Sequence, residues 1–231
     1  MIAGTGSNNT AHGIELTQAA EKAGADAALT VSPYYNKPSS EGLYFHFKSI
    51  HDSTKIPLIL YNIPGRSVVD ISNELVARLS ELERIAGIKD ASNDLSRPAW
   101  MRANCDPDFC LLSGEDPTAA GYLAQGGHGC ISVSANIAPA LCAQMHEAWQ
   151  EQNIDRFAAL RDQIFPLHSA LFFESSPSPT KYALSRLGFC TDETRAPILP
   201  ASKACRDAVD SAVTKVLGGY EKTDQKAVKT A

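Results

Sequence analysis

The chain has 231 residues, of which 44% are hydrophobic and 20% are charged, which is typical of a folded protein and argues against a disordered one. Its net charge of -5 argues against a broad surface for nucleic acid or for an acidic membrane. No apolar run approaches the ~20 residues of a membrane helix and no secretory signal is visible, so a cytoplasmic location is expected. The six cysteines form no CxxC pair and are expected to be reduced and mostly buried.

Short apolar runs alternate with longer amphipathic segments over the first 136 residues. Each run is apolar on both faces and ends in polar or glycine-containing sequence, which is typical of strands buried in a parallel sheet. The spacing between runs leaves room for one crossover helix each time. The expected strands are residues 2–5, 27–32, 57–62, 85–89, 109–113 and 129–134.

The segments between these strands have helical periodicity, and several open with capping residues. Ser39 and Ser72 each precede an acidic residue in the first turn, and Asp94 and Asp116 suit the positive end of a helix. The expected helices are residues 10–23, 39–53, 72–82, 94–104, 116–125, 139–150, 155–173, 180–187 and 202–217. No strand is expected after residue 136. We therefore expect a βα-repeat domain over residues 1–151, C-terminal helices over 152–217 and a disordered tail over 218–231.

Two architectures fit six βα units: an open doubly wound sheet, or a (β/α)8 barrel that lacks two of its eight units. The sequence pattern alone favours neither. In both, reactive groups belong at the C-terminal ends of the strands.

Lys89 is the most informative residue at a strand end, because it follows the apolar run Ile85–Ile88. Burial disfavours the charged form of a lysine, and a neutral amine can condense with a ketone to form an imine. The alternative is a structural lysine whose stem is buried while its ammonium reaches solvent or pairs with Asp90. Lys37 is a weaker candidate, because its Asn-Lys-Pro context indicates a loop.

Two further residues follow the preceding strand. Tyr61 ends that strand, so its phenol could lie near Lys89 and transfer protons, or it could be an ordinary core aromatic. Arg66 lies in a Pro-Gly turn and could bind a substrate carboxylate with two hydrogen bonds, or it could be an ordinary surface arginine.

Other kinds of site have little support. The Gly4-Thr5-Gly6 segment has Asn9 where a dinucleotide fingerprint needs its third glycine. The histidines form no HxH or HExxH pattern, and no GxSxG elbow is present. We therefore expect neither a cofactor nor a metal.

Several segments, in order and over residues 2–217, resemble the dihydrodipicolinate synthase (4-hydroxy-tetrahydrodipicolinate synthase) family of pyruvate-dependent Schiff-base aldolases. The Tyr-Asn-x-Pro-x-Arg form at 61–66 resembles this synthase more than the related N-acetylneuraminate lyase. The segments are IAGTGSN (2–8), YYNKPSSEGLYFHF (34–47), LYNIPGRS (60–67), GIKDAS (87–92), LLSGED (111–116), GGHGCISVSAN (126–136) and TKYAL (180–184).

The resemblance implies a TIM (β/α)8-type barrel followed by C-terminal helices, in a homotetramer of tight dimers. It implies that Lys89 forms the Schiff base with pyruvate, and that the enamine attacks L-aspartate 4-semialdehyde in lysine and diaminopimelate biosynthesis. Tyr61 would be the proton donor and acceptor, and Tyr35 a relay tyrosine that reaches the neighbouring subunit. Arg66 would bind the semialdehyde carboxylate. The pyruvate pocket would include Ile131 and Gly114.

The chain also departs from the family pattern. It has no counterpart of the first two βα units or of their Gly-Thr-Thr-Gly-Glu loop, so it resembles an N-terminally truncated barrel with strands three to eight. His12 replaces a glutamate common in lysine-inhibited members, which puts feedback inhibition in doubt. The two outermost strands would be unprotected edges, which predicts association or aggregation of the chain. In the family, a threonine of the missing loop belongs to the proton relay, so its absence predicts low synthase activity. Two further readings stay open: an impaired homologue that acts only by association, and another pyruvate aldolase such as N-acetylneuraminate lyase.

Overall fold

The computed structural model describes residues 1–220. These residues divide into two compact units, Met1–Ile131 and the described part of Ser132–Ala231. The predicted boundaries at residues 151 and 217 stay predictions. The predicted tail lies, from residue 221 onward, outside the described residues.

The first unit is an α/β half-barrel built on six parallel strands in sequence order, as the apolar runs predict. Each strand pairs only with its neighbours in the chain, so the two outermost strands have one partner each. The strands are β1 (Ile2–Gly4), β2 (Ala27–Val31), β3 (Leu58–Asn62), β4 (Ile85–Asp90), β5 (Cys110–Ser113) and β6 (Gly129–Cys130).

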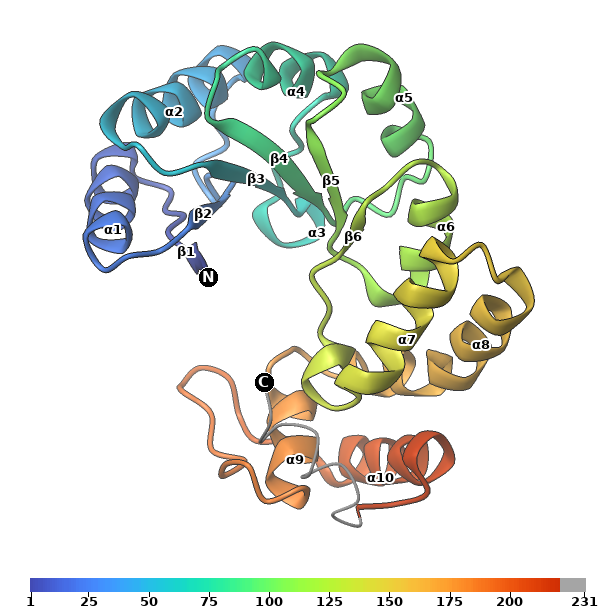
Figure 1. Ribbon diagram of the computed structural model, residues 1–231. Coiled ribbons are helices and arrows are strands. Elements are labelled where there is room, and N and C mark those ends of the chain that lie inside the picture. The colour runs from blue at the N-terminus through green and yellow to red at the C-terminus, as the bar shows by residue number, and fades with distance from the viewer. Residues whose placement is uncertain (221–231) are drawn as a thin grey trace. The chain divides into compact units, whose positions relative to one another are not determined.

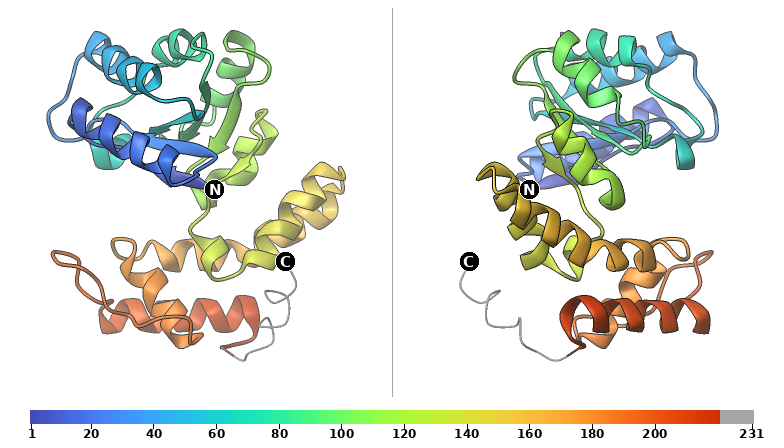
Figure 2. Two further views of the ribbon diagram at one scale, coloured as in Figure 1. Left: turned by 60° about the vertical axis from the view of Figure 1, so that its left-hand side comes forward. Right: turned by 90° about the vertical axis from the view of Figure 1, so that its right-hand side faces the viewer.

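Helices α1, α2, α4, α5 and α6 of this unit lie around the outer side of the curved sheet, whereas the short α3 lies near the strand ends (Figure 1); the further views show the same outer helices (Figure 2). Predicted caps are present: the side chains of Ser39 and Ser72 accept hydrogen bonds from the N–H groups of Gly42 and Leu75. The helices are α1 (Thr10–Lys22), α2 (Ser40–Ser53), α3 (Pro64–Ser67), α4 (Asn73–Ser80), α5 (Arg97–Asn104), the 3-10 turn η1 (Asp116–Thr118) and α6 (Ala119–Ala124).

The hydrophobic core fills the space between the sheet and these helices. Leu60 of β3 and Ile88 of β4 are fully buried in it, together with Phe47 of α2. Because side chains alternate along a strand, the residues that follow Leu60 and Ile88 point to the opposite, inner face. Those residues are Tyr61 and Lys89, so the packing of the core places both side chains on the inner face.

Some predictions for this unit are wrong. The last strand stops at Cys130 instead of Ser134, because its only neighbour, β5, ends at Ser113 and leaves no further ladder partner. The first strand is not buried on both faces: Ile2 is 46% exposed, since β1 is an outermost strand.

The loop after β4 and the segment after β3 also differ from the predictions. Helix α5 begins at Arg97 and not at Asp94, because the Asp94 carboxylate accepts hydrogen bonds from the N–H and hydroxyl of Ser96 and closes a turn before the helix. Pro64–Ser67, expected to be a turn, forms the short helix α3.

The second unit is helical in its described part. Apolar residues of α8, among them Ile164 and Leu167, are fully buried, as is Val213 of α10. Its elements are the 3-10 turn η2 (Ser134–Asn136), α7 (Pro139–Gln150), α8 (Ile154–Leu171), α9 (Ser178–Arg186) and α10 (Lys203–Leu217).

Over residues 1–220, no helix has both the length and the hydropathy to span a membrane. Only Cys142 and Cys205 are buried among the six cysteines, so the prediction that most of them are buried is wrong.

We expect Gly87→Ala to lower the free energy of unfolding of the half-barrel by about 1–3 kcal/mol. A Cβ at Gly87 would lie 2.3 Å from the Cys110 carbonyl oxygen, a backbone atom of the neighbouring strand that cannot move without breaking the ladder. Urea unfolding measures the loss as a lower midpoint. Gly4→Ala is the matched control, because Gly4 is also in a strand and nothing lies within 4 Å of its added Cβ. Equal midpoints for both variants would contradict the steric argument.

Candidate active site

The structure brings Lys89 and Tyr61 together on the inner face of the sheet. They are register partners on the adjacent strands β4 and β3. The Lys89 Nζ lies over the Tyr61 ring, 4.0 Å from its centroid. A lysine amine and a phenol thus share one position near the C-terminal ends of two parallel strands, where the reactive groups of α/β proteins belong.

The surroundings of Lys89 favour a neutral amine. Burial lowers the pKa of Lys89, and electrostatic interactions with Cys130, Glu115 and Asp116 oppose this effect without reversing it. At a given pH, more of the amine is therefore neutral and nucleophilic than in an exposed lysine. Asp90 does not serve as its counter-ion: the Asp90 carboxylate accepts a hydrogen bond from Arg97 at 2.7 Å. The structure therefore contradicts the alternative in which Lys89 pairs with Asp90.

The phenol of Tyr61 is held in its protonated form. Burial and the negative charge of Glu115 raise the pKa of Tyr61, and only Arg66 opposes them. The hydroxyl therefore keeps its proton to a higher pH than an exposed tyrosine does. It can donate that proton to a developing oxyanion or amine and regain it later in a cycle.

Gly114 follows β5 and leaves room for the Lys89 side chain. An added Cβ would lie 3.0 Å from Lys89 Cε and 2.8 Å from Ala91 Cβ. The Gly114 N–H already donates to the Asp90 carbonyl at 2.7 Å, so the missing side chain is what this residue contributes. Ile131 follows β6, is partly buried, and donates its N–H to the Ser113 carbonyl at 2.9 Å.

Glu115 is a residue of this site to which the sequence assigned no role. The segment 113–116 follows a strand and carries polar groups, but nothing in the pattern shows which of them faces Lys89. Burial and the neighbouring Asp116 raise the pKa of the Glu115 carboxyl, while Lys89 and Arg66 lower it. Glu115 is thus electrostatically coupled to both predicted cations of the site, and its own burial makes it easier to protonate than an exposed glutamate.

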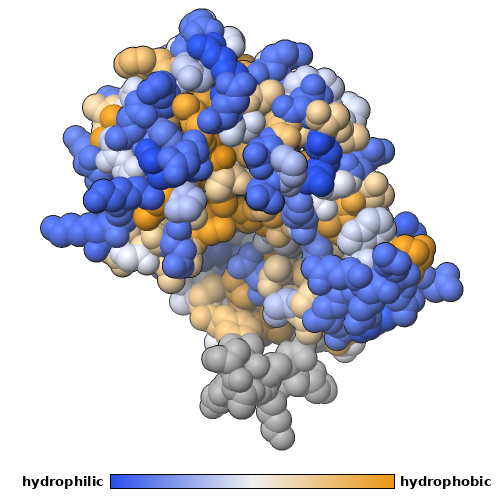
Figure 3. Space-filling view, turned by 45° about the horizontal axis from the view of Figure 1, so that its top comes forward, coloured by the Kyte–Doolittle hydropathy of each residue, from blue (hydrophilic) through white to orange (hydrophobic). Residues whose placement is uncertain are grey.

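A cavity of about 390 Å³ lies beside Tyr61 on the inner face. Arg66, which is exposed on α3, lines the cavity together with Tyr61, so a carboxylate bound there could meet the guanidinium. The remaining lining residues are mostly apolar or glycine: Gly4, Gly6, Leu29, Val31, Tyr34, Ile63 and Ser67. Figure 3 shows one face of the molecule, on which hydrophobic residues lie among clusters of hydrophilic ones.

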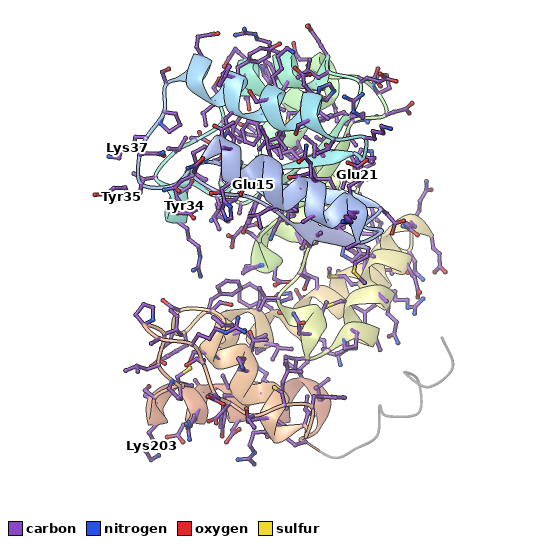
Figure 4. All side chains as sticks on the ribbon, turned by 90° about the vertical axis from the view of Figure 1, so that its left-hand side faces the viewer. Glu15, Glu21, Tyr34, Tyr35, Lys37 and Lys203 are labelled. Carbon is purple, nitrogen blue, oxygen red and sulfur yellow. The ribbon has the colours of Figure 1, made fainter. Side chains whose placement is uncertain are left out.

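Tyr35 is a predicted site residue that the structure does not bring to Lys89. Its side chain is 87% exposed and projects outward from the loop after β2, as does that of Lys37 (Figure 4). The loop is held by hydrogen bonds between Asn8 and the residues on either side of Tyr35. The backbone of Tyr35 has a φ of 74°, a left-handed conformation that is energetically unfavourable for a residue with a large side chain.

Among residues 1–220, no group of three or more His, Cys, Asp or Glu residues could hold a metal ion.

An α/β half-barrel that presents a partly desolvated lysine beside a tyrosine at its strand ends is typical of imine-forming barrel enzymes. Residues 1–216 match the Dihydrodipicolinate synthetase family, and the chain belongs to this family.

Similar proteins of known sequence and structure agree with this assignment. A 4-hydroxy-tetrahydrodipicolinate synthase of Rhodospirillum centenum is 56% identical over 93% of this chain and 74% of its own length. The chloride-inhibited dihydrodipicolinate synthase of Acinetobacter baumannii, solved in complex with pyruvate, is 42% identical with a TM-score of 0.90 over 93% of this chain and 74% of that one. The dihydrodipicolinate synthase of Thermotoga maritima is 35% identical with a TM-score of 0.91 over 93% and 74%. These similarities confirm the predicted family and favour the synthase over N-acetylneuraminate lyase and over a homologue that acts only by association.

Proposed function

We propose that this chain condenses pyruvate with L-aspartate 4-semialdehyde to give 4-hydroxy-tetrahydrodipicolinate, a step of lysine and diaminopimelate biosynthesis in the cytoplasm. The observation that carries this proposal is the position of the Lys89 amine, 4.0 Å from the centre of the Tyr61 ring on the inner face of the sheet. The names of the relatives at 48–56% identity support the choice of substrates.

The chemistry begins at Lys89. Its neutral amine attacks the C2 carbonyl of pyruvate, and loss of water leaves an imine between Nζ and C2. The protonated imine draws electrons from the neighbouring methyl group, which loses a proton to give an enamine. The enamine carbon then attacks the aldehyde carbon of the semialdehyde, and the alkoxide that forms takes up a proton to become the hydroxyl. The amino group of the former semialdehyde next attacks C2 of the imine, and the bond between C2 and Nζ breaks. This step closes the ring of the product and frees the amine of Lys89.

We assign the proton transfers to Tyr61, whose hydroxyl keeps its proton because burial raises its pKa. Arg66 would bind the carboxylate of the semialdehyde from the rim of the cavity that it shares with Tyr61. Gly114 would leave space for the Lys89 stem, and Ile131 would line the pyruvate pocket.

Tyr35 would contribute to the proton relay from a neighbouring subunit of a homo-oligomer, which the family resemblance describes as a tetramer of tight dimers. Two features of Tyr35 support this role. Its side chain is 87% exposed, and its backbone has an unfavourable left-handed conformation. Strain at one exposed aromatic residue is typical of a functional contact.

The test is to mix the 1–231 chain with pyruvate and borohydride, which reduces an imine to a stable amine. Mass spectrometry of the peptide that contains Lys89 should then find the reduced pyruvate adduct. Addition of aspartate semialdehyde before borohydride should consume both substrates. Cleavage of N-acetylneuraminate at a higher rate than this condensation would favour the lyase. A chain that binds copies of itself but forms no adduct would favour a homologue that acts only by association.

We expect Arg66→Gln to raise the KM for aspartate semialdehyde about 10- to 100-fold, the range expected for losing hydrogen bonds to a charged group. The yield of the trapped pyruvate adduct should stay the same, because Arg66 is not needed for imine formation. Steady-state kinetics with each substrate varied in turn measures the split. Arg78→Gln removes the same charge from the exposed face of α4 and is the control. A larger effect on pyruvate than on the semialdehyde would remove Arg66 from this role.

A further inference from the structure

Directly beyond Tyr61 and Lys89, a buried polar cluster lies on the opposite face of the same two strands. The next residues, Asn62 of β3 and Asp90 of β4, are again register partners. Both are buried, at 0% and 3% exposure. The Asn62 amide donates to the Asp90 carboxylate at 3.3 Å and to Asp70 at 2.7 Å. Since side chains alternate along a strand, this cluster stands behind the lysine and the tyrosine.

Arg97, the first residue of α5, closes the cluster from the helix side. Its Nε donates to the Asp90 carboxylate at 2.7 Å, and the two side chains are only 6% and 1% exposed. Its Nη2 donates to the Ile71 carbonyl at 2.8 Å. A guanidinium is rigid and planar, so these two hydrogen bonds fix Arg97 relative to both partners.

The cluster also fixes the backbone at the strand ends. The Asn62 side-chain oxygen accepts from the Ile71 N–H at 3.0 Å, and the Asp90 carboxylate accepts from the Ser92 N–H at 3.0 Å. One buried cluster therefore joins the ends of β3 and β4, the chain after α3 and the start of α5. Lys89 shares a peptide bond with Asp90, and Tyr61 shares one with Asn62, so the backbone that carries each reactive side chain cannot turn unless this cluster breaks.

We propose that the Asp90–Arg97 ion pair with Asn62 is a positioning device that holds the Lys89 amine against the Tyr61 ring and away from bulk water. This inference rests on the proposed function for its use in imine formation. The ion pair itself touches neither substrate nor reacting atom, so Asp90 and Arg97 are positioning residues. Burying an ion pair is costly because both charges lose their water, and here the pair fixes the two strand ends that carry the site.

The titratable groups that face Lys89 come from three places in the fold. Tyr61 contacts it from β3, Glu115 and Asp116 act from the segment that follows β5, where Asp116 begins η1, and Cys130 acts from β6. Arg66 acts on Tyr61 and on Glu115. A change in the titration of Lys89 is therefore attributable to the cluster only if the substitution leaves these groups and the total charge unchanged.

Arg97→Lys meets that condition, because it keeps the charge and loses the fork geometry. We would measure competitive acetylation of Lys89 against the exposed Lys55 as a function of pH, by mass spectrometry and without pyruvate, since only the neutral amine reacts. In the unchanged chain the midpoint of Lys89 should lie below that of Lys55. In Arg97→Lys it should rise by about one pH unit, which is a tenfold change in the neutral fraction at a given pH. The trapped pyruvate adduct should form about tenfold more slowly per folded molecule.

Val76→Ala is the control for stability alone, because Val76 is fully buried in the core of the same unit, on α4. It should unfold at a lower urea concentration with the Lys89 midpoint unchanged. Should Arg97→Lys fail to unfold cooperatively, Asn62→Ser takes its place: it removes the amide that joins the two strands, changes no charge, and should give the same rise. A Lys89 midpoint equal to that of the unchanged chain, in whichever variant folds, overturns the proposal. A low midpoint that rises in the variant, without any pyruvate adduct in the unchanged chain, supports the positioning role and contradicts the proposed function.

Discussion

Lys89→Ala should abolish the borohydride-trapped pyruvate adduct completely. The alanine has no amine, and the part of the sheet around residue 89 offers no other lysine: β3, β4 and β5 carry Lys89 alone. The other reactive groups of the site are the acids Glu115 and Asp116, the phenol of Tyr61, the thiol of Cys130 and the guanidinium of Arg66, none of which forms a stable imine with a ketone at neutral pH. Mass spectrometry of the intact chain after pyruvate and borohydride measures the loss.

Two variants serve as controls for this result. Lys89→Arg keeps the positive charge in a group that stays protonated and does not form an imine, so the adduct should again be absent. Lys55→Ala removes an exposed lysine and should leave the adduct yield unchanged. An adduct that persists in Lys89→Ala would assign the imine to another lysine. Loss of the adduct in Lys55→Ala would also assign the imine to a lysine other than Lys89.

The position of Lys89 could be predicted from the sequence because strand pattern and charge coincide there. Only one lysine follows directly on one of the predicted strand runs, and the run before it in the chain carries Tyr61 next to its last residue. Adjacent parallel strands of similar length bring their ends to one edge, and the observed register pairs these two residues. The prediction thus needed only strand period and strand order.

The partners behind the site could not be predicted in the same way. The sequence suggested Asp90 as a counter-ion of Lys89, since they are neighbours in the chain. Alternation along β4 sends their side chains to opposite faces, and Asp90 pairs with Arg97. That pair depends on where α5 begins, which the turn at Asp94 decides. The steric role of Gly114 likewise depends on the path of the Lys89 side chain, which no local pattern contains.

The ends of the sheet differ most from the sequence pattern. Both outermost runs are apolar enough to be central strands, yet β1 and β6 each pair on one side only. A strand without a second neighbour loses half its ladder, so β6 is short and β1 is exposed. The predicted association of the chain through these strands stays a prediction, which sedimentation at increasing protein concentration would test.

Tyr61→Phe should lower kcat for the condensation by about 10²- to 10⁴-fold, the usual contribution of a general acid–base group. The substitution keeps the ring that lies 4.0 Å from the Lys89 Nζ and removes only the hydroxyl. The Lys89 amine should therefore stay in place, and pyruvate should still be trapped on it. Steady-state turnover and adduct yield, measured on the same protein, separate the two effects.

Tyr122→Phe is the matched control for Tyr61→Phe, because Tyr122 is a buried tyrosine of the same unit on α6 and its hydroxyl makes no hydrogen bond in the described chain. Loss of that hydroxyl should leave turnover unchanged.

The pH profiles of turnover should also differ between the unchanged chain and Tyr61→Phe. In the unchanged chain, activity should persist to alkaline pH, because burial raises the pKa of Tyr61 and the proton it donates is lost only above that raised value. In Tyr61→Phe the alkaline fall due to this group should disappear. Equal turnover in Tyr61→Phe and the unchanged chain would exclude Tyr61 from the proton transfers and leave Lys89 as the one assigned reactive group of the two strands.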